Sequence, residues 1–268
     1  MLTLITSINE RLYHDYGKRF IESWRCNAGS GVRLVVCLEG NTTNIDTLSS
    51  EKLIFCDLES NKSKQFRLKY SKFFQAAGLV PTRVSDAENL YKFSYNYRYD
   101  ALRFSFKAFS YYRVISELSL TSQFVGWIDS DVVCLRQFSL DDLSDVLPRS
   151  GELGAYLGRT MFPRPLPYSE CGFLAFQYTD FAAQSFIDDF VNMYDSGAVF
   201  LNPEWHDCIA FDVLRRRYEM SGHKFRNLSA DFQSEEHPFV KSKLGVFFDH
   251  LKGPARKLVG SSRLFDSK

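Results

Sequence analysis

The chain has 268 residues, of which 45% are hydrophobic and 16% aromatic, enough apolar side chain to bury a large core without disulfides. Lys and Arg number 33 and Asp and Glu 32, and this near balance argues against a dedicated nucleic-acid-binding protein. No apolar run reaches the roughly 18 residues that a membrane-spanning helix needs.

The cysteines and the first residues indicate the compartment. The six cysteines are widely separated and include no Cys-x-x-Cys pair, which excludes a disulfide framework and a structural zinc site. The opening stretch, MLTLITSINERLY, lacks the basic and apolar regions of a signal peptide. We therefore expect a cytoplasmic protein in which most cysteines are small buried hydrophobes.

The first elements in the chain predict an α/β sheet that opens with a strand-helix-strand unit. Apolar residues recur every four positions from Leu12 to Trp24, which predicts one face of a helix, with Ser7 or Asn9 as its cap. Strands are expected on either side of this helix, at LTLIT (2–6), VRLVVCLEG (32–40) and KLIFCDL (52–58).

The pattern between about residues 60 and 122 is mainly helical. One helix is expected to end at Gly78, and a longer one to begin at about Asp100. No repeat or linker follows, so the favoured organisation is a single domain. The remaining expected elements are strands at 124–129, 152–158 and 171–177, helices within 179–197 and 206–222, and a short strand-like segment at 245–250.

Two carboxylates, Asp129 and Asp131, follow the strand at 124–129 and are separated by Ser130. Alternation along an extended chain sends both side chains to the same side. Carboxylate oxygens suit Mg²⁺ or Mn²⁺, and ligands gather at the carboxyl ends of strands in open α/β sheets. The alternative is that both aspartates cap the following turn in solvent.

The stretch DHLKGPARK, residues 249–257, adds groups of complementary chemistry. His250 could supply a third metal ligand, and Gly253 would let the backbone approach a phosphate closely. Arg256 or Lys257 could neutralise a diphosphate. The alternative is a basic surface tail with an incidental histidine.

WIDSDVV together with HLKGPARK resembles the nucleotide-sugar glycosyltransferases of the GT-A fold, most closely the retaining glycosyltransferase family 8. The resemblance implies one α/β domain over residues 1–257, with a mixed, mainly parallel sheet flanked by helices, and a tail at 258–268. It also implies a UDP-sugar donor. Asp129, Asp131 and His250 would bind Mn²⁺ or Mg²⁺, and Ser130, between the two aspartates, would border the bound donor. The diphosphate-binding lysine of that family falls one position late here, at Lys257, and Arg256 occupies its place.

Further positions are compatible with the same resemblance. In ITSINERLY, Thr6 and Ser7 would border the nucleoside base and Tyr13 could stack on it; packing of Tyr13 inside the protein is the alternative. In the helix before the aspartates, Arg103 and Lys107 lie one turn apart and could approach the diphosphate or sugar. Either could equally be a solvated helix charge.

The acceptor side is expected at two later stretches, PYSECGFLAFQ and the Trp205-His206-Asp207 run. Trp205 offers an aromatic platform for a sugar, and His206 could hydrogen-bond hydroxyls. An inverting enzyme would need a carboxylate base, for which Glu170 and Asp207 are the candidates. The simpler interpretation of Asp207 is that it stabilises the amino end of a helix.

The sequence therefore predicts transfer of a sugar to a hydroxyl of a glycan or glycolipid, as in polysaccharide or lipopolysaccharide synthesis, with retention favoured. Two alternatives stay open: a haloacid-dehalogenase-like phosphohydrolase with Asp129 as nucleophile, and a sugar- or nucleotide-binding module without turnover. The basic run from Lys62 to Lys72 is either a solvated helix face or a peripheral contact with a membrane. No nucleic-acid partner is expected.

Overall fold

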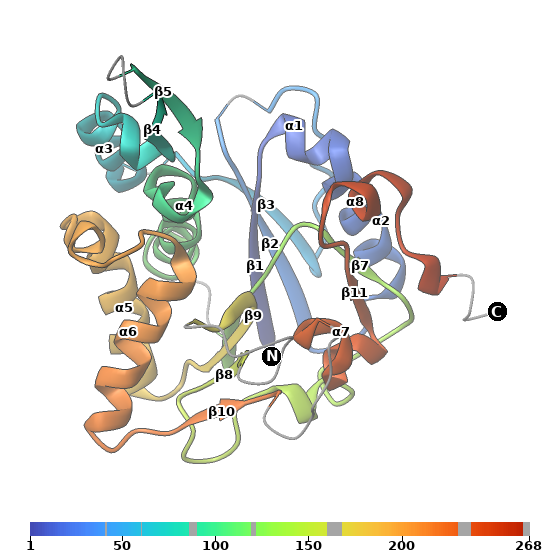
Figure 1. Ribbon diagram of the computed structural model, residues 1–268. Coiled ribbons are helices and arrows are strands. Elements are labelled where there is room, and N and C mark those ends of the chain that lie inside the picture. Colours follow the sequence, from blue (N-terminus) through green and yellow to red (C-terminus); the bar gives the residue numbers. More distant parts are fainter. Residues whose placement is uncertain are drawn as a thin grey trace.

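The computed structural model describes residues 1–40, 42–59, 61–85, 90–118, 122–159, 168–229 and 237–264. A seven-stranded sheet in the order β10-β8-β9-β6-β1-β2-β3 forms its centre (Figure 1). Neighbouring strands are parallel except around β9, which is antiparallel to both β6 and β8. The strands are β1 (Leu2–Ile8), β2 (Val32–Leu38), β3 (Leu53–Asp57), β6 (Phe124–Ile128), β8 (Gly154–Leu157), β9 (Glu170–Gln177) and β10 (Phe225–Asn227).

Helices cover both faces of this sheet, and each face has its own apolar core (Figure 1). Polar side chains cap two of the helices: Asn9, one of the two predicted caps, accepts a hydrogen bond from the Leu12 amide at 3.0 Å, and Asp180 accepts one from the Ala182 amide. One face carries α3 (Asn61–Tyr70), α4 (Ala101–Tyr112), α5 (Phe181–Asp195) and α6 (Asp207–Met220), and the other carries α1 (Glu10–Leu12), α2 (Lys18–Asn27), α7 (Pro238–Lys241) and α8 (Pro254–Val259).

The helix expected at the start of the chain forms, with one local irregularity. Residues Tyr13–Gly17 make a π-helical turn between α1 and α2, so the helical run continues from residue 10 to 27. Trp24 is fully buried and donates its indole N–H to the Lys52 carbonyl at 2.9 Å. No helix among the described residues is both long and apolar enough to cross a bilayer.

The region between residues 60 and 100 differs from the prediction. Gly78 does end a helical turn in the left-handed conformation, at φ +77°, but this turn is a separate 3-10 helix, Phe74–Ala77. An antiparallel hairpin follows, formed by β4 (Leu79–Ser85) and β5 (Leu90–Tyr95). The missed signal is the alternation of aromatic and other residues in LYKFSYNY, a period of two that favours a strand over a helix.

A second small sheet connects the end of the chain to the strand-end aspartates. It pairs β7 (Val132–Cys134) with β11 (Phe248–His250) in antiparallel register, with His250 opposite Val132. The Leu251 amide also donates to the Asp131 carbonyl at 2.8 Å. This pairing brings together two segments that are separated by more than a hundred residues in the sequence.

The end of the described chain packs on the same sheet. Helix α8 runs through residue 257, and Ser261 donates to the Asp249 carboxylate at 2.5 Å. Arg263 donates to the Gly245 carbonyl at 2.6 Å. Residues 258–264 are therefore in contact with the segment that carries His250, while the division into a domain and a tail at residue 257 stays a prediction.

Candidate active site

Asp129 and Asp131 lie at the carboxyl end of β6, where the strand gives way to a turn before β7. The Asp129 amide donates to the Gly172 carbonyl at 2.9 Å, which extends the β6–β9 pairing by one residue. The Trp127 indole donates to Asp129 Oδ1 at 2.7 Å, so that carboxylate is oriented by its own strand. Asp129 stays partly open, with 28% of its side chain exposed.

His250 completes the predicted ligand set. The register of β11 on β7 puts its imidazole beside the aspartates, with Nε2 2.9 Å from Asp131 Oδ1 and 3.7 Å from Asp129 Oδ2. One ligand atom from each residue lies within 4.8 Å of the other two. Two carboxylates and an imidazole are a donor set that divalent ions such as Mn²⁺ accept.

The structure separates the roles of the two late basic residues. Lys257 Nζ lies 2.7 Å from Asp131 Oδ2 and 4.5 Å from the centre of the Tyr16 ring. Arg256 turns away, donating to Asp249 at 2.6 Å and to the His250 carbonyl at 3.1 Å. Gly253, at φ +91°, begins the short helix that carries both. Lys257 therefore faces the site, and Arg256 braces β11.

The charges around Asp131 determine its ionisation. Burial alone would raise its pKa, but His250 and then Lys257 outweigh burial and hold the pKa well below its usual range. The carboxylate is thus ionised at neutral pH and able to bind a cation.

Lys107 and Asp207 form a buried ion pair behind the aspartates. Their side chains are only 6% and 5% exposed, and the ammonium group also donates to the Cys171 carbonyl at 2.7 Å. It lies 3.8 Å from Asp129 Oδ1, which links the pair to the strand end. Burial would lower the pKa of Lys107, but Asp207 and then Asp129 raise it overall; the Asp207 pKa is correspondingly lowered, mainly by Lys107 against burial.

Two thiols lie next to this ion pair. Cys171 and Cys208 have sulfur atoms within 4.8 Å of each other and of the Asp207 carboxylate. A hydrogen bond from Cys171 is the main reason that the pKa of Cys208 falls to about 6. All six cysteines of the chain are free thiols.

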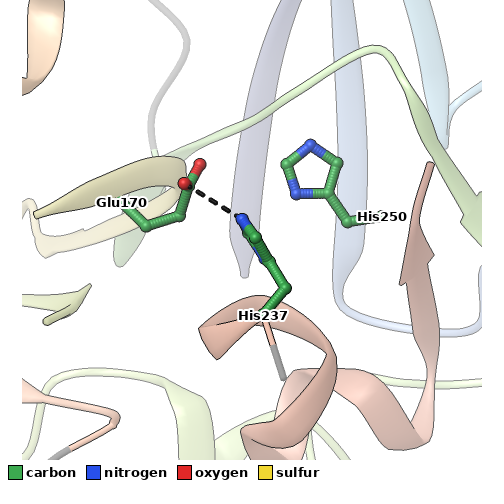
Figure 2. A group of neighbouring side chains, drawn as sticks. All are labelled: Glu170, His237 and His250. Carbon is green, nitrogen blue, oxygen red and sulfur yellow. Dashed lines mark hydrogen bonds and ion pairs between the residues drawn. The ribbon is translucent and has the colours of Figure 1, made fainter. Parts of the chain in front are cut away.

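Glu170 gathers with His237 and His250 in a second group of side chains, drawn in Figure 2, whose ligand atoms lie within 4.8 Å of one another; Glu170 is almost fully buried. Its carboxylate pairs with Arg159, with Lys252 at 3.2 Å and with His237 Nε2 at 3.1 Å. Burial is the main reason that the pKa of His237 falls to about 2, so this imidazole is neutral. Sequence reasoning missed His237 because no motif surrounds it; only the following Pro238, at the start of α7, marks its place.

Gly172 makes room for this arrangement at the start of β9. A Cβ atom there would lie 2.9 Å from His250 Cε1, 3.1 Å from Glu170 Oε1 and 3.2 Å from Asp129 Oδ2. The three functional groups thus converge on a backbone position that has no side chain. A glycine is needed here for close approach rather than for a special backbone angle.

The predicted nucleoside-side residues lie at the end of β1. Thr6 and Ser7 are buried, and Ser7 donates to Glu39 Oε1 at 2.6 Å. Thr6 Oγ1 has no hydrogen-bond partner among the described residues. Tyr13 is 5% exposed and packs in the core between the sheet and α2, so in this conformation its ring does not offer a free stacking surface.

Ser130 lies between the two aspartates in the chain, whereas Arg103 lies in the first turn of α4. Burial is the main cause of the raised pKa of Tyr16, and Ser130, between the two aspartates, offsets part of that rise. Arg103, in the first turn of α4, donates to the Tyr95 hydroxyl at 3.3 Å. Its guanidinium is exposed and does not contact Asp129 or Asp131 within ion-pair distance.

His206 caps α6 beside Asp207 and is buried among aromatic rings. Its Nε2 lies 2.8 Å from Glu204 Oε2, and the Tyr168 ring centre lies 4.6 Å from its own. Trp205 is 8% exposed and packs edge-on against Phe200 at 5.0 Å. The expectation of a Trp205 platform for a sugar was wrong, because that ring belongs to the core.

No protein-family model and no curated protein matches this sequence. Among solved structures, the bifunctional glycosyltransferase WbbM aligns with a TM-score of 0.50 and 11% identity, covering 100% of this chain and 51% of WbbM. Mouse xyloside xylosyltransferase 1 aligns at 0.44 and 11%, covering 85% of each chain, and GlyE of Streptococcus pneumoniae at 0.46 and 11%, covering 85% and 46%. This chain spans about half the length of WbbM and GlyE. The likeness to WbbM concerns the fold, and it confirms the predicted α/β, GT-A-type fold class.

Proposed function

We propose that this protein is a metal-dependent glycosyltransferase that moves a sugar from a nucleoside diphosphate, UDP, to a hydroxyl of a glycan or glycolipid. The observation that carries the proposal is the convergence of Asp129, Asp131 and His250 at the end of β6, beside Lys257. The resemblance to glycosyltransferase family 8, synthesis of polysaccharide or lipopolysaccharide, and a cytoplasmic location belong to the same proposal.

The donor set suits Mn²⁺ or Mg²⁺. His250 is fully buried, its Nδ1 has no partner among the described residues, and its Nε2 faces the two carboxylates. Histidine binds a metal through an unprotonated ring nitrogen, and aspartate binds one as the carboxylate. A divalent cation bound here would act as a Lewis acid that stabilises the charge of the departing diphosphate.

Lys257 would supply a second positive charge to the same diphosphate. Its ammonium group now pairs with Asp131, and 27% of the side chain is exposed, so a phosphate can reach it from solvent. Thr6 and Ser7 lie at the end of β1, the strand next to β6, which supports a place for the nucleoside on that side. Arg103 and Ser130 would border the bound donor, and Gly253 keeps the approach to Lys257 open, since nothing lies within 4 Å of its Cβ position.

Retention of the anomeric configuration is supported by the ion pairs that the two candidate bases, Asp207 and Glu170, form within the protein. Asp207 is held by Lys107, and Glu170 by Arg159, Lys252 and His237. An inverting enzyme needs a carboxylate ready to accept the acceptor proton, and carboxylates bound in ion pairs are poor proton acceptors. In this proposal Asp207, His206 and Glu170 shape the acceptor side without acting as the base of a direct displacement.

Calorimetry of UDP binding, with and without Mn²⁺, tests the donor site. The native chain should bind UDP only with the metal, and Asp131→Asn should weaken binding by about 100-fold or more, because it removes one charged ligand. Asp141→Asn, an exposed aspartate ten residues further on, is the matched control and should bind as the native chain does. UDP binding without metal, or equal binding by Asp131→Asn, would contradict the proposal.

A second assay separates the three functional alternatives. Slow, Mn²⁺-dependent hydrolysis of one UDP-sugar in a panel is the expected result. Hydrolysis of simple phosphoesters, with labelling of Asp129 by phosphate, would instead support the phosphohydrolase. UDP binding without turnover of any UDP-sugar, with or without glycan acceptors, would support the binding module.

A further inference from the structure

Basic side chains dominate the region formed by α3, the turn Phe74–Ala77 and the β4–β5 hairpin, at one end of the molecule (Figure 1). The whole chain carries a net charge of only +1. Residues 61–99 nevertheless contain eight basic residues and only two acidic ones, Asp86 and Glu88. Their basic residues are Lys62, Lys64, Arg67, Lys69, Lys72, Arg83, Lys92 and Arg98.

Several of these cations are not neutralised by the protein. Lys62 pairs with Asp195 and Arg98 with Glu204. Among these eight residues, four exposed lysines form no ion pair with any residue that the structure describes. These are Lys64, Lys69, Lys72 and Lys92. A cluster of unpaired cations of this kind attracts an anionic surface.

Large apolar side chains project from the same region. Phe74 and Phe93 are each 60% exposed, although their rings contact each other edge-on at 6.1 Å. Leu68 and Tyr95 are also more than half exposed. Single exposed apolar residues need no explanation, but a group of aromatic and aliphatic side chains among lysines marks an interaction site.

We propose that this region, the hairpin face, docks on a bilayer that contains anionic phospholipid. The lysines would contact lipid phosphates, while Phe74, Phe93 and Leu68 enter the boundary between headgroups and acyl chains. Tyr95 has the amphipathic side chain that is enriched at that boundary. A soluble polyanion would pair with the lysines but leave the phenylalanines and Leu68 in water. A bilayer with anionic lipid would both pair with the lysines and bury the apolar side chains.

The hairpin face is connected to the acceptor side of the proposed active site. The Tyr95 hydroxyl donates to Asp100, the cap of α4, at 2.9 Å, and α4 carries Lys107. Tyr97, two residues further on, lies 3.1 Å from the Tyr168 hydroxyl, and its ring centre is 6.0 Å from that of His206. A docked bilayer would therefore present lipid-linked acceptors near His206. This last step rests on the proposed function; docking itself does not.

Sedimentation with vesicles of equal parts phosphatidylglycerol and phosphatidylcholine, against pure phosphatidylcholine, tests docking with the full chain. The native protein should bind the anionic vesicles at least tenfold more tightly. Lys69→Gln combined with Lys72→Gln should weaken binding by about 25-fold, since each cation near a lipid surface contributes about 1 kcal/mol. Phe74→Ser combined with Phe93→Ser should weaken vesicle binding by roughly tenfold or more. It should also reduce the fraction of vesicle binding that remains at high salt, where the contribution of the lysines is screened.

Matched controls use residues of the same kinds outside the hairpin face. Phe181→Ser and Lys224→Glu change an 81%-exposed phenylalanine and an exposed lysine elsewhere, and should bind vesicles as the native chain does. Metal-dependent UDP binding should be unchanged in every variant, so a failure of docking is distinct from a failure of the donor site. Equal binding to both vesicle types would overturn the proposal. Binding that heparin abolishes and that ignores the phenylalanines would assign the face to a soluble polyanion instead.

Discussion

Two groups of charged side chains lie within a few ångströms of each other in this protein and differ in how their charges are balanced. Lys107 and Asp207 are almost completely buried, and Asp207 is the nearer of the two carboxylates that Lys107 pairs with. Asp129 and Asp131 stand together at a strand end, with His250 and Lys257 on one side and with Asp129 open to solvent. The charges of the first group neutralise each other inside the protein, whereas the second group has carboxylate oxygens that a ligand can reach. Substitutions in the first should therefore affect folding, and substitutions in the second should affect binding.

The largest effect is expected from breaking the buried pair. Asp207→Ala leaves Lys107 charged and without its main partner, and should lower the free energy of unfolding by about 3–5 kcal/mol. Urea denaturation followed by circular dichroism measures this. The double variant Lys107→Met with Asp207→Leu removes both charges and should recover most of the loss.

The control for that prediction is the ion pair of Lys62 with Asp195, whose side chains are both about one-third exposed. Lys62→Ala should cost less than about 1 kcal/mol, because solvent screens the pair. If Asp207→Ala proved as mild as Lys62→Ala, the contrast between the two charged groups would fail.

Arg256 and Lys257, neighbours on α8, should differ in whether their loss affects stability or UDP binding. Arg256→Met should lower stability by about 2 kcal/mol, because it takes a charged hydrogen-bond donor from the fully buried Asp249. Lys257→Met should instead weaken Mn²⁺-dependent UDP binding by about tenfold with little change in stability. Each variant serves as the control of the other in denaturation and calorimetry. The reverse pattern would give Arg256 the phosphate-binding role.

The absence of a side chain at Gly172 should be needed for tight binding of Mn²⁺. Gly172→Ala should push His250 or Asp129 aside and weaken Mn²⁺ binding by about tenfold, measured by electron paramagnetic resonance. Gly151→Ala is the control: its φ of +80° makes alanine cost about 1 kcal/mol of stability, but nothing lies within 4 Å of the added atom. Unchanged Mn²⁺ binding by Gly172→Ala would show that His250 is not held as closely as the structure indicates.

The smallest effect is a difference in pH dependence. The folded-state pKa of Asp207 lies below that of an unfolded aspartate, about 3.9, so its contribution to stability is complete above that value. It is lost as the pH falls through the lower folded-state value. The stability of the native chain should therefore fall more steeply in acid than that of the Lys107→Met, Asp207→Leu double variant. Parallel pH profiles for the two proteins in urea denaturation would contradict this assignment.

Several features of the protein followed from the sequence alone. Short apolar runs identified β1, β2, β3 and β6, and β1, β2 and β6 are buried along nearly their whole length. Longer stretches of mixed apolar and polar residues identified the helices α5 and α6. The position of Asp129 and Asp131 at a strand end followed from the same pattern. The sequence motif around His250 also named a histidine that the structure places beside Asp129 and Asp131; its role as a metal ligand stays a prediction. The β4–β5 hairpin was missed because its aromatic residues suggest helix and strand equally until their spacing is counted.

Only the tertiary structure decided how the charged residues pair. The pairing of β11 with β7 returns the chain to the aspartates, and on α8 Lys257 then faces Asp131 while Arg256 faces Asp249. The packing of α4 against α6 joins Lys107 to Asp207. His237 and the space at Gly172 could not be predicted, since they depend on contacts between segments far apart in the chain. Residue types and local spacing determine which chemistry is available. Which groups meet depends on long-range packing, which places the neighbouring residues Arg256 and Lys257 against two different carboxylates, Asp249 and Asp131.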